Sequence, residues 1–418
     1  MAYTDFIAAI DLGTSHMVGM VGTKNATGAL SIIAYEVENS GTCIRRGCVY
    51  NVKETASKIK RLILKLENKL GGTKIGQVYV GLGGQSLRSI EHTVCKVLGT
   101  EGVVTEEIID SLYQECKDYR PDMLTVLDVV SPSYFLDDKP ESNPVGVPCS
   151  RIEARYKLIV GRPSLKLNIV NSISEQAKIE IAGILVSPLA LGDVVLSDNE
   201  KDLGCALIGF GAGVTTISVY KGGKLASLSV VPFGGNLITK DITNLRVVES
   251  EAERLKITYG SAKADRDNDM TIQVSLADGM GLREIKLAEL NGVIEARMDE
   301  ILENVYARLE ATGLMSVLGA GIVITGGGAA LKNLPAVMSE RLKMEVRYSA
   351  VRKGVVASGD LVVASNPEYA VAVGLLAKGT KNCALYIPPK PEPKIEPVVE
   401  PEPIVEPTPE PEPVKEKP

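Results

Sequence analysis

The start of the chain contains several short apolar runs and one stripe of apolar residues at helical spacing. Residues 6–37 hold three such runs, FIAAIDLG, MVGMVG and SIIAYEV, and the first ends in a glycine turn that leads into the second as its hairpin partner. Residues 53–70 predict a helix with a basic outer face, because apolar side chains recur at helical spacing. These are Ile59, Leu62, Ile63, Leu66 and Leu70. A further run at 77–84 completes a predicted β-β-β-α-β unit.

Residues 84–162 follow a different order. A helix is predicted at 106–119, with Thr105 as its N-cap. Extended patterns surround it at 86–99, 124–137 and 151–162. We interpret this β-α-β-β stretch as a small inserted domain, after which helical character is predicted to resume over 166–183.

The layout of the first hairpin recurs later in the chain. Residues 205–235 again read as an apolar strand, a small glycine turn and a β-branched strand, which indicates a weak internal duplication. Helices are predicted around 236–257 and 284–312. Residues 321–334 (GIVITGGGAALKNL) predict a buried strand, a triple-glycine turn and the start of a helix.

The composition changes sharply near residue 387. Residues 388–418 contain 12 of the 22 prolines, eight Glu and four Lys. Proline lacks the amide donor that a helix needs, and little in this segment can be buried. We expect an extended, acidic spacer, with an interaction motif as the alternative.

Charge and cysteine content exclude several classes of protein. The net charge is −6 and Trp is absent, which argues against a nucleic-acid surface. No apolar run approaches the ~20 residues that span a bilayer, and no secretory signal pattern is visible, so a cytoplasmic protein is expected. The seven cysteines contain no CxxC pair, which predicts free thiols and no structural zinc.

Three glycine turns carry the candidate chemistry. In the first, Asp11 ends a strand, Gly13 permits a tight turn, and two hydroxyls follow at Thr14 and Ser15. Such a turn exposes amide groups to phosphate oxygens, and the carboxylate can hold hydrated Mg²⁺. The other two turns are GFGAG at 209–213 and TGGG at 325–328. Each turn alone is equally typical of close packing, and the P-loop pattern is absent, but the three in this order are more specific.

In this order the turns resemble the phosphate-1, phosphate-2 and adenosine signatures of the actin–Hsp70–hexokinase superfamily, and within it the FtsA family. The resemblance covers about residues 5–380. It is carried by AIDLGTSHMVGMVG, IRRGCVYNVKETASKIKRLI, VYVGLGG before the insertion, VVPFGGNLITKDI with SEAERLKITYG, and PEYAVAVGLLAKG. MreB is disfavoured because the insertion comes early, and Hsp70 because the tail cannot hold a peptide-binding domain.

The resemblance implies an α/β, actin-like ATPase fold with two lobes and an inserted 1C (SHS2-type) subdomain. The expected divisions are 1A at 1–83 and 163–195, 1C at 84–162, 2A at 196–240 and 318–387, 2B at 241–317, and a disordered Pro/Glu-rich linker at 388–418.

The resemblance also implies a nucleotide site for ATP and Mg²⁺. Asp11 would hold Mg²⁺ through water, and the first turn would hold the β- and γ-phosphates. Glu253 and Lys256 would contact ribose and adenine; without the resemblance they would read as a solvated ion pair. The remaining implied contacts are Gly13, Thr14, Ser15, His16, Gly211, Gly213, Gly234, Gly235, Asn236, Gly326, Gly327 and Gly328.

Four positions depart from the family pattern. Gly209 stands where the phosphate-2 turn begins with Asp, and Val214 replaces its Thr. His16 replaces Lys, and Ser187 replaces the Glu that orients the attacking water. Phosphoryl transfer depends on metal, positive charge and water positioning. We therefore expect ATP binding with very slow or no hydrolysis, and the catalytic residues stay unknown.

The FtsA family implies an actin-like division protein that polymerises and tethers the FtsZ ring to the inner face of the cytoplasmic membrane at the division site. Subdomain 2B would receive the FtsZ C-terminal tail, and later divisome proteins would follow. The final residues PEPVKEKP cannot form the family's amphipathic membrane helix, and we expect that helix to have been removed from this chain. A small-molecule kinase of the same fold and a nucleotide-free scaffold are the alternatives.

Overall fold

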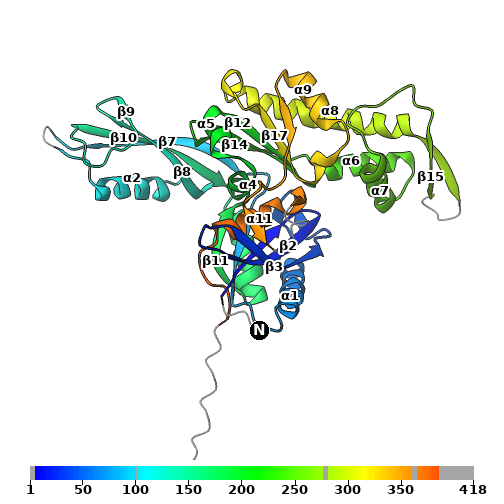
Figure 1. Cartoon of the computed structure of the whole chain (residues 1–418), viewed down its shortest axis with the longest axis horizontal. Helices are drawn as coiled ribbons and strands as arrows, with labels where there is room; N and C mark the ends of the chain where they lie inside the picture. The colour runs from blue at the N-terminus through cyan, green and yellow to red at the C-terminus, as the bar shows by residue number, and fades with distance from the viewer. Residues whose placement is uncertain (1–4, 100–101, 276–280, 359–364, 386–418) are drawn as a thin grey trace, which may run out of the picture. The chain divides into compact units, whose positions relative to one another are not determined.

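The N-terminal apolar runs pair into a six-stranded sheet (Figure 1). The computed structural model describes residues 5–99, 102–275, 281–358 and 365–385. The strand order is β11-β6-β1-β2-β3-β19, in which β1, β2 and β3 are antiparallel and the other neighbours are parallel. The bounds are β1 Ile7–Leu12, β2 His16–Lys24, β3 Leu30–Asn39, β6 Gln77–Leu82, β11 Glu180–Val186 and β19 Val356–Ser358.

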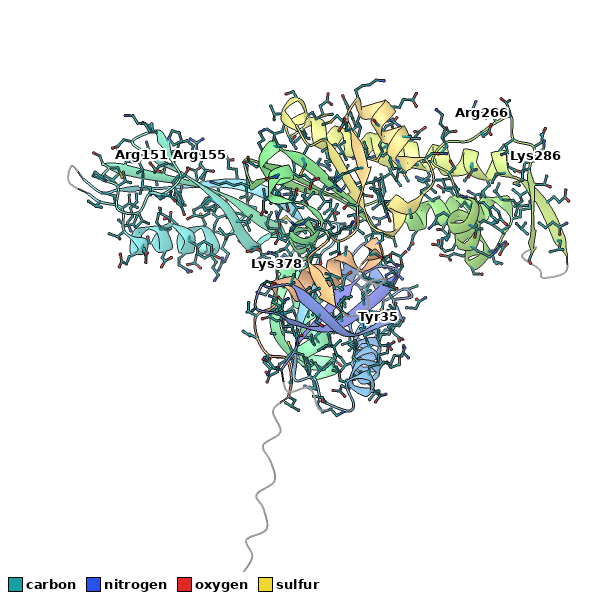
Figure 2. The ribbon with its side chains drawn as sticks, in the orientation of Figure 1. Tyr35, Arg151, Arg155, Arg266, Lys286 and Lys378 are labelled. Atoms are coloured by element: carbon teal, nitrogen blue, oxygen red, sulfur yellow. The ribbon has the colours of Figure 1, made fainter. Side chains whose placement is uncertain are left out.

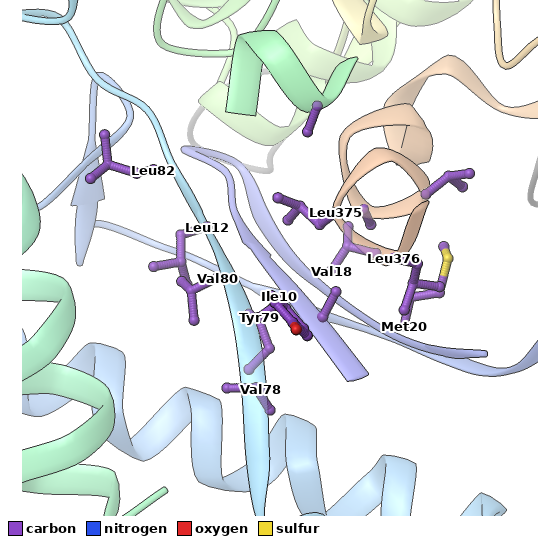
Figure 3. Close-up of a cluster of buried hydrophobic side chains, with 14 of the residues drawn as sticks. Ile10, Leu12, Val18, Met20, Val78, Tyr79, Val80, Leu82, Leu375 and Leu376 are labelled. Carbon is purple, nitrogen blue, oxygen red and sulfur yellow. The ribbon is translucent and has the colours of Figure 1, made fainter. Parts of the chain in front are cut away.

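Helices cover both faces of this sheet, which explains why β1 is apolar at nearly every position. Helix α1 (Val52–Lys69) begins at Asn51, whose side chain accepts a hydrogen bond from the Glu54 amide at 3.1 Å. Helix α11 (Ala370–Lys378) packs on β1, β2 and β6. Figure 3 shows Leu375 and Leu376 of α11 beside residues of these strands.

A second sheet repeats the arrangement of the first. Its order is β14-β13-β12-β17-β18, again with an antiparallel three-stranded meander joined to parallel strands. The bounds are β12 Cys205–Phe210, β13 Thr215–Lys221, β14 Lys224–Val231, β17 Ile322–Thr325 and β18 Val346–Tyr348. The internal duplication predicted from the two hairpins is confirmed.

The inserted stretch forms a four-stranded antiparallel sheet with its own core, under helix α2 (Glu106–Asp118). Thr105 caps that helix as predicted, accepting from the Ile108 amide at 3.4 Å. The Leu228 amide of β14 donates to Ser89 Oγ at 2.8 Å, which joins the insertion to the second sheet. Arg151 and Arg155 lie on strand β10 (Figure 2). The strands are β7 Arg88–Val97, β8 Thr125–Leu136, β9 Lys139–Glu141 and β10 Arg151–Gly161.

The remaining elements connect and cover the sheets. The α-helices are α4 Ser187–Val195, α5 Asp198–Leu203, α6 Gly235–Ile242, α7 Glu249–Tyr259, α8 Leu287–Glu310 and α9 Leu334–Leu342. The short strands are β4 Ile44–Arg45, β5 Cys48–Val49, β15 Thr271–Ser275 and β16 Leu282–Lys286. Short 3-10 turns are Thr243–Leu245, Met315–Val317, Gly327–Ala330 and Pro367–Tyr369.

The helix predicted over 166–183 is confirmed as far as Ala177 and is wrong after it. Helix α3 (Ser164–Val170) continues as a π-helix (Asn171–Ala177), and Lys178 then takes a left-handed φ of 61°. The next residues form β11, because pairing with β6 at the edge of the first sheet outweighs the helical pattern. The helix predicted at 284–312 likewise begins only at Leu287, after strand β16.

Helix α11 and strand β19 belong structurally to the first sheet, although they fall inside the 318–387 segment expected in 2A. The C-terminal segment therefore returns to the sheet from which the chain started. The subdomain divisions otherwise stay a prediction, and the linker expected at 388–418 lies outside the described residues. Within the described ranges, no helix combines the length and apolarity needed to cross a membrane.

Candidate nucleotide-binding site

A cavity of about 270 Å³ lies where the strand ends of the two sheets face each other. The three glycine turns identified in the sequence meet there, although about 300 residues separate the first from the third. Of the residues predicted for the site, all but Gly234 line it: Asp11, Gly13, Thr14, Ser15, His16, Gly211, Gly213, Gly235, Asn236, Glu253, Lys256, Gly326, Gly327 and Gly328. The substituted positions Ser187 and Gly209 line it as well.

Asp11 is the penultimate residue of strand β1, beneath the first turn, and it is partly buried where it lines the cavity. Burial raises the pKa of its carboxyl from 3.8 to about 6, partly offset by the Leu12 amide. Among the described residues, no Lys or Arg forms an ion pair with it. A buried carboxylate without a counter-ion is a suitable partner for a hydrated cation.

The first turn is closely packed around its hydroxyl groups. Ser40 Oγ donates to the Gly13 carbonyl at 2.7 Å, and Thr14 Oγ1 accepts from the Gly47 amide at 2.9 Å. Ser15 Oγ lies 2.9 Å from His16 Nδ1. Burial lowers the pKa of His16, and Glu368 only partly offsets this. His16 is therefore neutral at neutral pH and supplies no fixed positive charge.

The second turn is held from behind by the start of α6. The Gly235 amide donates to the Gly211 carbonyl at 3.0 Å, and the Asn236 amide donates to the Ala212 carbonyl at 2.8 Å. A Cβ on Gly234 would lie 2.5 Å from the Gly211 carbonyl oxygen. Gly234 thus supports the second turn and is not among the lining residues, and its place near the phosphates stays a prediction.

The first and second turns touch across the cavity. A Cβ on Gly213 would lie 2.5 Å from Thr14 Oγ1 and 3.0 Å from Arg46 Cα. Glycine is therefore required there by the close approach of two backbones.

Glu253 and Lys256 form a network as well as facing the cavity. Lys256 Nζ lies 2.7 Å from Glu253 Oε2, 2.8 Å from Thr239 Oγ1 and 3.2 Å from the Gly235 carbonyl. Thr239 Oγ1 also donates to Glu253. The pair therefore joins α7 to α6 beside the second turn, so it is more than a solvated ion pair.

The third turn closes the cavity from the second sheet. Gly326 has a φ of 91°, and a Cβ on it would lie 2.6 Å from the Phe210 carbonyl oxygen. A Cβ on Gly327 would lie 2.8 Å from Glu368 Oε1. Thr325 Oγ1 is buried at the edge of this turn and has no hydrogen-bond partner among the described residues. Such an orphaned group is usually satisfied by a ligand or water.

Sequence analysis did not assign several lining residues to the site, although Phe210, Ala212 and Thr325 lie within the second and third turns. The unassigned residues are Leu12, Gly47, Gly81, Gly83, Gly84, Pro188, Leu191, Phe210, Ala212, Val214, Thr216, Ile257, Thr325, Pro367, Glu368 and Val371. Glu368 had one available signal, since it precedes the recognised closing helix and so begins the element that returns to the first sheet.

The lining residues fit a magnesium-bound nucleotide. Among those described, the ionised side chains are Asp11, Glu253, Glu368 and Lys256, so carboxylates outnumber cations. Glycine turns leave room for phosphates at the backbone, but the side chains do not neutralise a triphosphate. A divalent cation held beside Asp11 would supply that charge.

Solved structures place the fold among the actin-like ATPases. A chain of the PilM-PilN type IV pilus biogenesis complex matches with a TM-score of 0.61 at 16% identity, over 88% of this chain and 97% of that one. A chain of the MamK double helical filament matches with a TM-score of 0.51 at 12% identity, over 89% and 97%. At these sequence identities, the two matches show the fold of this chain and nothing about its function.

The family follows from closer relatives. The family model for cell division protein FtsA matches residues 206–374. Cell division protein FtsA of Porphyromonas gingivalis is 39% identical over 91% of this chain and 79% of its own. FtsA of Bacillus subtilis is 32% identical over 92% and 86%. The chain belongs to the FtsA family of cell division proteins.

Proposed function

We propose that this chain binds ATP·Mg²⁺ in the cavity, polymerises, and tethers the FtsZ ring to the cytoplasmic membrane while recruiting later divisome proteins. The observation that carries the proposal is the convergence of three glycine turns from two sheets around one partly buried carboxylate, with which no Lys or Arg of the described residues forms an ion pair. No feature of the cavity specifically favours a small-molecule kinase.

Each turn has a distinct part in binding. Asp11 would hold Mg²⁺ through its water ligands, and the cation would supply positive charge beside the phosphates. The amides of the first and second turns contact phosphates, and the contact between Gly213 and Thr14 brings the two turns together around them. Glu253 and Lys256, already ordered by Thr239, face the nucleoside end.

Hydrolysis is expected to be very slow. Ser187 Oγ is too short and too weak a base to orient water as a carboxylate does, and Gly209 offers no side chain. His16 adds little positive charge because its pKa is lowered. The nucleotide then acts mainly by holding the two sheets at one angle.

Self-assembly is supported by family membership and by the filament-forming neighbour. In the inserted stretch, Val97 is 77% exposed at one end of the sheet and Met123 is 92% exposed near the other, and we assign these two side chains to contacts with the next protomer. In the expected 2B region, Met270 and Leu282 are exposed near Lys286, a mixed surface suited to the FtsZ tail. Attachment to the inner face of the membrane would come from a family-type amphipathic helix.

Calorimetry and thermal melting with ATP, ADP and candidate sugars test the nucleotide proposal. We expect heat and a melting shift with ATP·Mg²⁺ and none with sugars. A sugar response would favour a kinase, and no response to any ligand would favour a nucleotide-free scaffold.

Electron microscopy on lipid monolayers tests assembly, using the chain with an amphipathic helix supplied. Filaments are expected, and deletion of 84–162 should abolish them. A double variant, Val97→Glu with Met123→Glu, should weaken them while the fold is kept. Unchanged filaments in both variants would contradict a role of the insertion in assembly.

A further inference from the structure

The duplicated sheets place two corresponding residues at the floor of the cavity. Asp11 is the penultimate residue of β1, and Gly209 is the penultimate residue of β12. Each is followed by one apolar residue and then a turn glycine. The first sheet therefore presents a carboxylate where the second presents no side chain.

Two threonines flank Gly209. Thr216 is its antiparallel partner on β13, and Thr325 is its parallel partner on β17. Asp11 instead pairs with Val18 across its hairpin, and the position of a Cβ on Gly81 lies 3.2 Å from Asp11 Oδ1. Gly209 thus has a threonine on each neighbouring strand and no carboxylate at its own position.

The hydroxyl of Thr216 lies in the space that a side chain at 209 would need. A Cβ on Gly209 would lie only 2.7 Å from Thr216 Oγ1. Both Thr216 and Thr325 line the cavity. Thr325 Oγ1 is buried and has no partner in the described part of the chain. Thr216 is partly exposed to the cavity, and no hydrogen bond joins its hydroxyl to another described residue.

The neighbouring threonine provides a natural contrast. Thr215 Oγ1 donates to the Phe233 carbonyl at 2.9 Å, and Thr215 does not line the cavity. Its hydroxyl is used within the fold, whereas those of Thr216 and Thr325 are left for a ligand.

We propose that Thr216 and Thr325 are positioning residues for the hydration shell of the nucleotide-bound Mg²⁺, opposite Asp11. This inference rests on the proposed function. Mg²⁺ keeps several waters when it binds through one or two carboxylates and substrate phosphates. A hydroxyl can accept from such a water and donate to a phosphate oxygen, without the charge that a second carboxylate would bring.

The test measures the Mg²⁺ concentration that gives half of the maximal melting shift at saturating ADP. Thr216→Val and Thr325→Val keep the side-chain shape and remove the hydroxyl, and each should raise that concentration about threefold to tenfold. Thr215→Val should lower the melting temperature of the free protein and leave the Mg²⁺ requirement unchanged.

An unchanged Mg²⁺ requirement in both Thr216→Val and Thr325→Val would overturn the inference while nucleotide binding stands. A wild-type protein that shows no melting shift with ADP or ATP at any Mg²⁺ concentration would instead overturn the proposed function, and this inference with it.

A second pair of variants tests whether the Thr216 hydroxyl occupies the space that a side chain at position 209 would need. Gly209→Asp should lower the melting temperature, because its Cβ meets Thr216 Oγ1. Gly209→Asp with Thr216→Ala should restore stability and need less Mg²⁺ than the wild type. A single variant as stable as the wild type would contradict the placement of the Thr216 hydroxyl.

Discussion

The two sheets share one strand order and differ at the residue that faces the cavity. In the first, Asp11 is partly buried, its pKa is raised, and no Lys or Arg in the described part of the chain forms an ion pair with it. In the second, Gly209 lies between two threonines. The same backbone frame therefore carries a charged strand end on one side and a neutral one on the other.

We expect this difference between the two sheets to affect nucleotide hydrolysis more than nucleotide binding. Contacts made by turn amides depend on glycine backbones, and those are present in both halves. Turnover depends on preorganised charges, and these are reduced at Gly209, Ser187 and His16. The comparison predicts a protein that holds nucleotide much better than it hydrolyses it.

The largest expected effect is on the stability of the free protein. A pKa of Asp11 raised from 3.8 to about 6 corresponds to about 3 kcal/mol at neutral pH, and Asp11→Asn should recover part of it. Because the pKa is raised, the wild type is stabilised below about pH 4 and loses that stability as pH rises to about 6. Denaturant melts from pH 4 to 7 should therefore diverge between the two proteins, and a constant difference would contradict the burial of an unpaired carboxylate.

The same substitution should have the opposite effect on ligand binding. Asp11→Asn should weaken ATP·Mg²⁺ about 10- to 100-fold, because contacts with a charged group contribute about 1.5–3 kcal/mol. Gly209→Asn is the corresponding change in the second sheet and should cost less affinity, because its Cβ displaces the Thr216 hydroxyl but removes no carboxylate. Calorimetry at saturating Mg²⁺ measures both, and equal losses would remove the asymmetry between the sheets.

A substitution that forces the first and second glycine turns apart should lower stability and nucleotide affinity by an intermediate amount. Gly213→Ala places a methyl group against Thr14 and the Arg46 backbone, and should cost about 1–3 kcal/mol of stability as well as nucleotide affinity. Gly292→Ala is the control, because it lies within α8 with nothing within 4 Å of its Cβ position. It should stabilise the protein by about 0.5–1 kcal/mol, and a similar loss in both variants would contradict the contact between turns.

The smallest effect is expected behind the cavity, where α4 and α11 meet. Burial would raise the pKa of Asp193, but hydrogen bonds from Lys201 and Lys378 outweigh it and lower the pKa. Asp193→Asn should cost less than about 1 kcal/mol at pH 7, since these side chains are partly exposed. The difference from the wild type should shrink below about pH 4, and a difference that persists in acid would argue against the ion pairs.

Local patterns determined most of the elements. The hairpin runs, the α1 stripe, the Thr105 cap and the duplication could be predicted because period and turn chemistry act over short distances. The glycine turns could also be found, since the backbone requirement for glycine is visible in the sequence. Strand β11 could not, because its pairing with β6 depends on residues about 100 positions away.

Tertiary structure alone decided which groups share the cavity. Glu368 reaches Gly327 only because α11 returns to the first sheet, and Thr216 meets the space at Gly209 only through the register of β12 and β13. Packing against Gly211 likewise places Gly234 behind the second turn. The sequence gives the chemistry of each side chain. Which side chains lie close together across a sheet, or between two sheets, depends on how distant segments pack, and short-range sequence patterns do not contain that information.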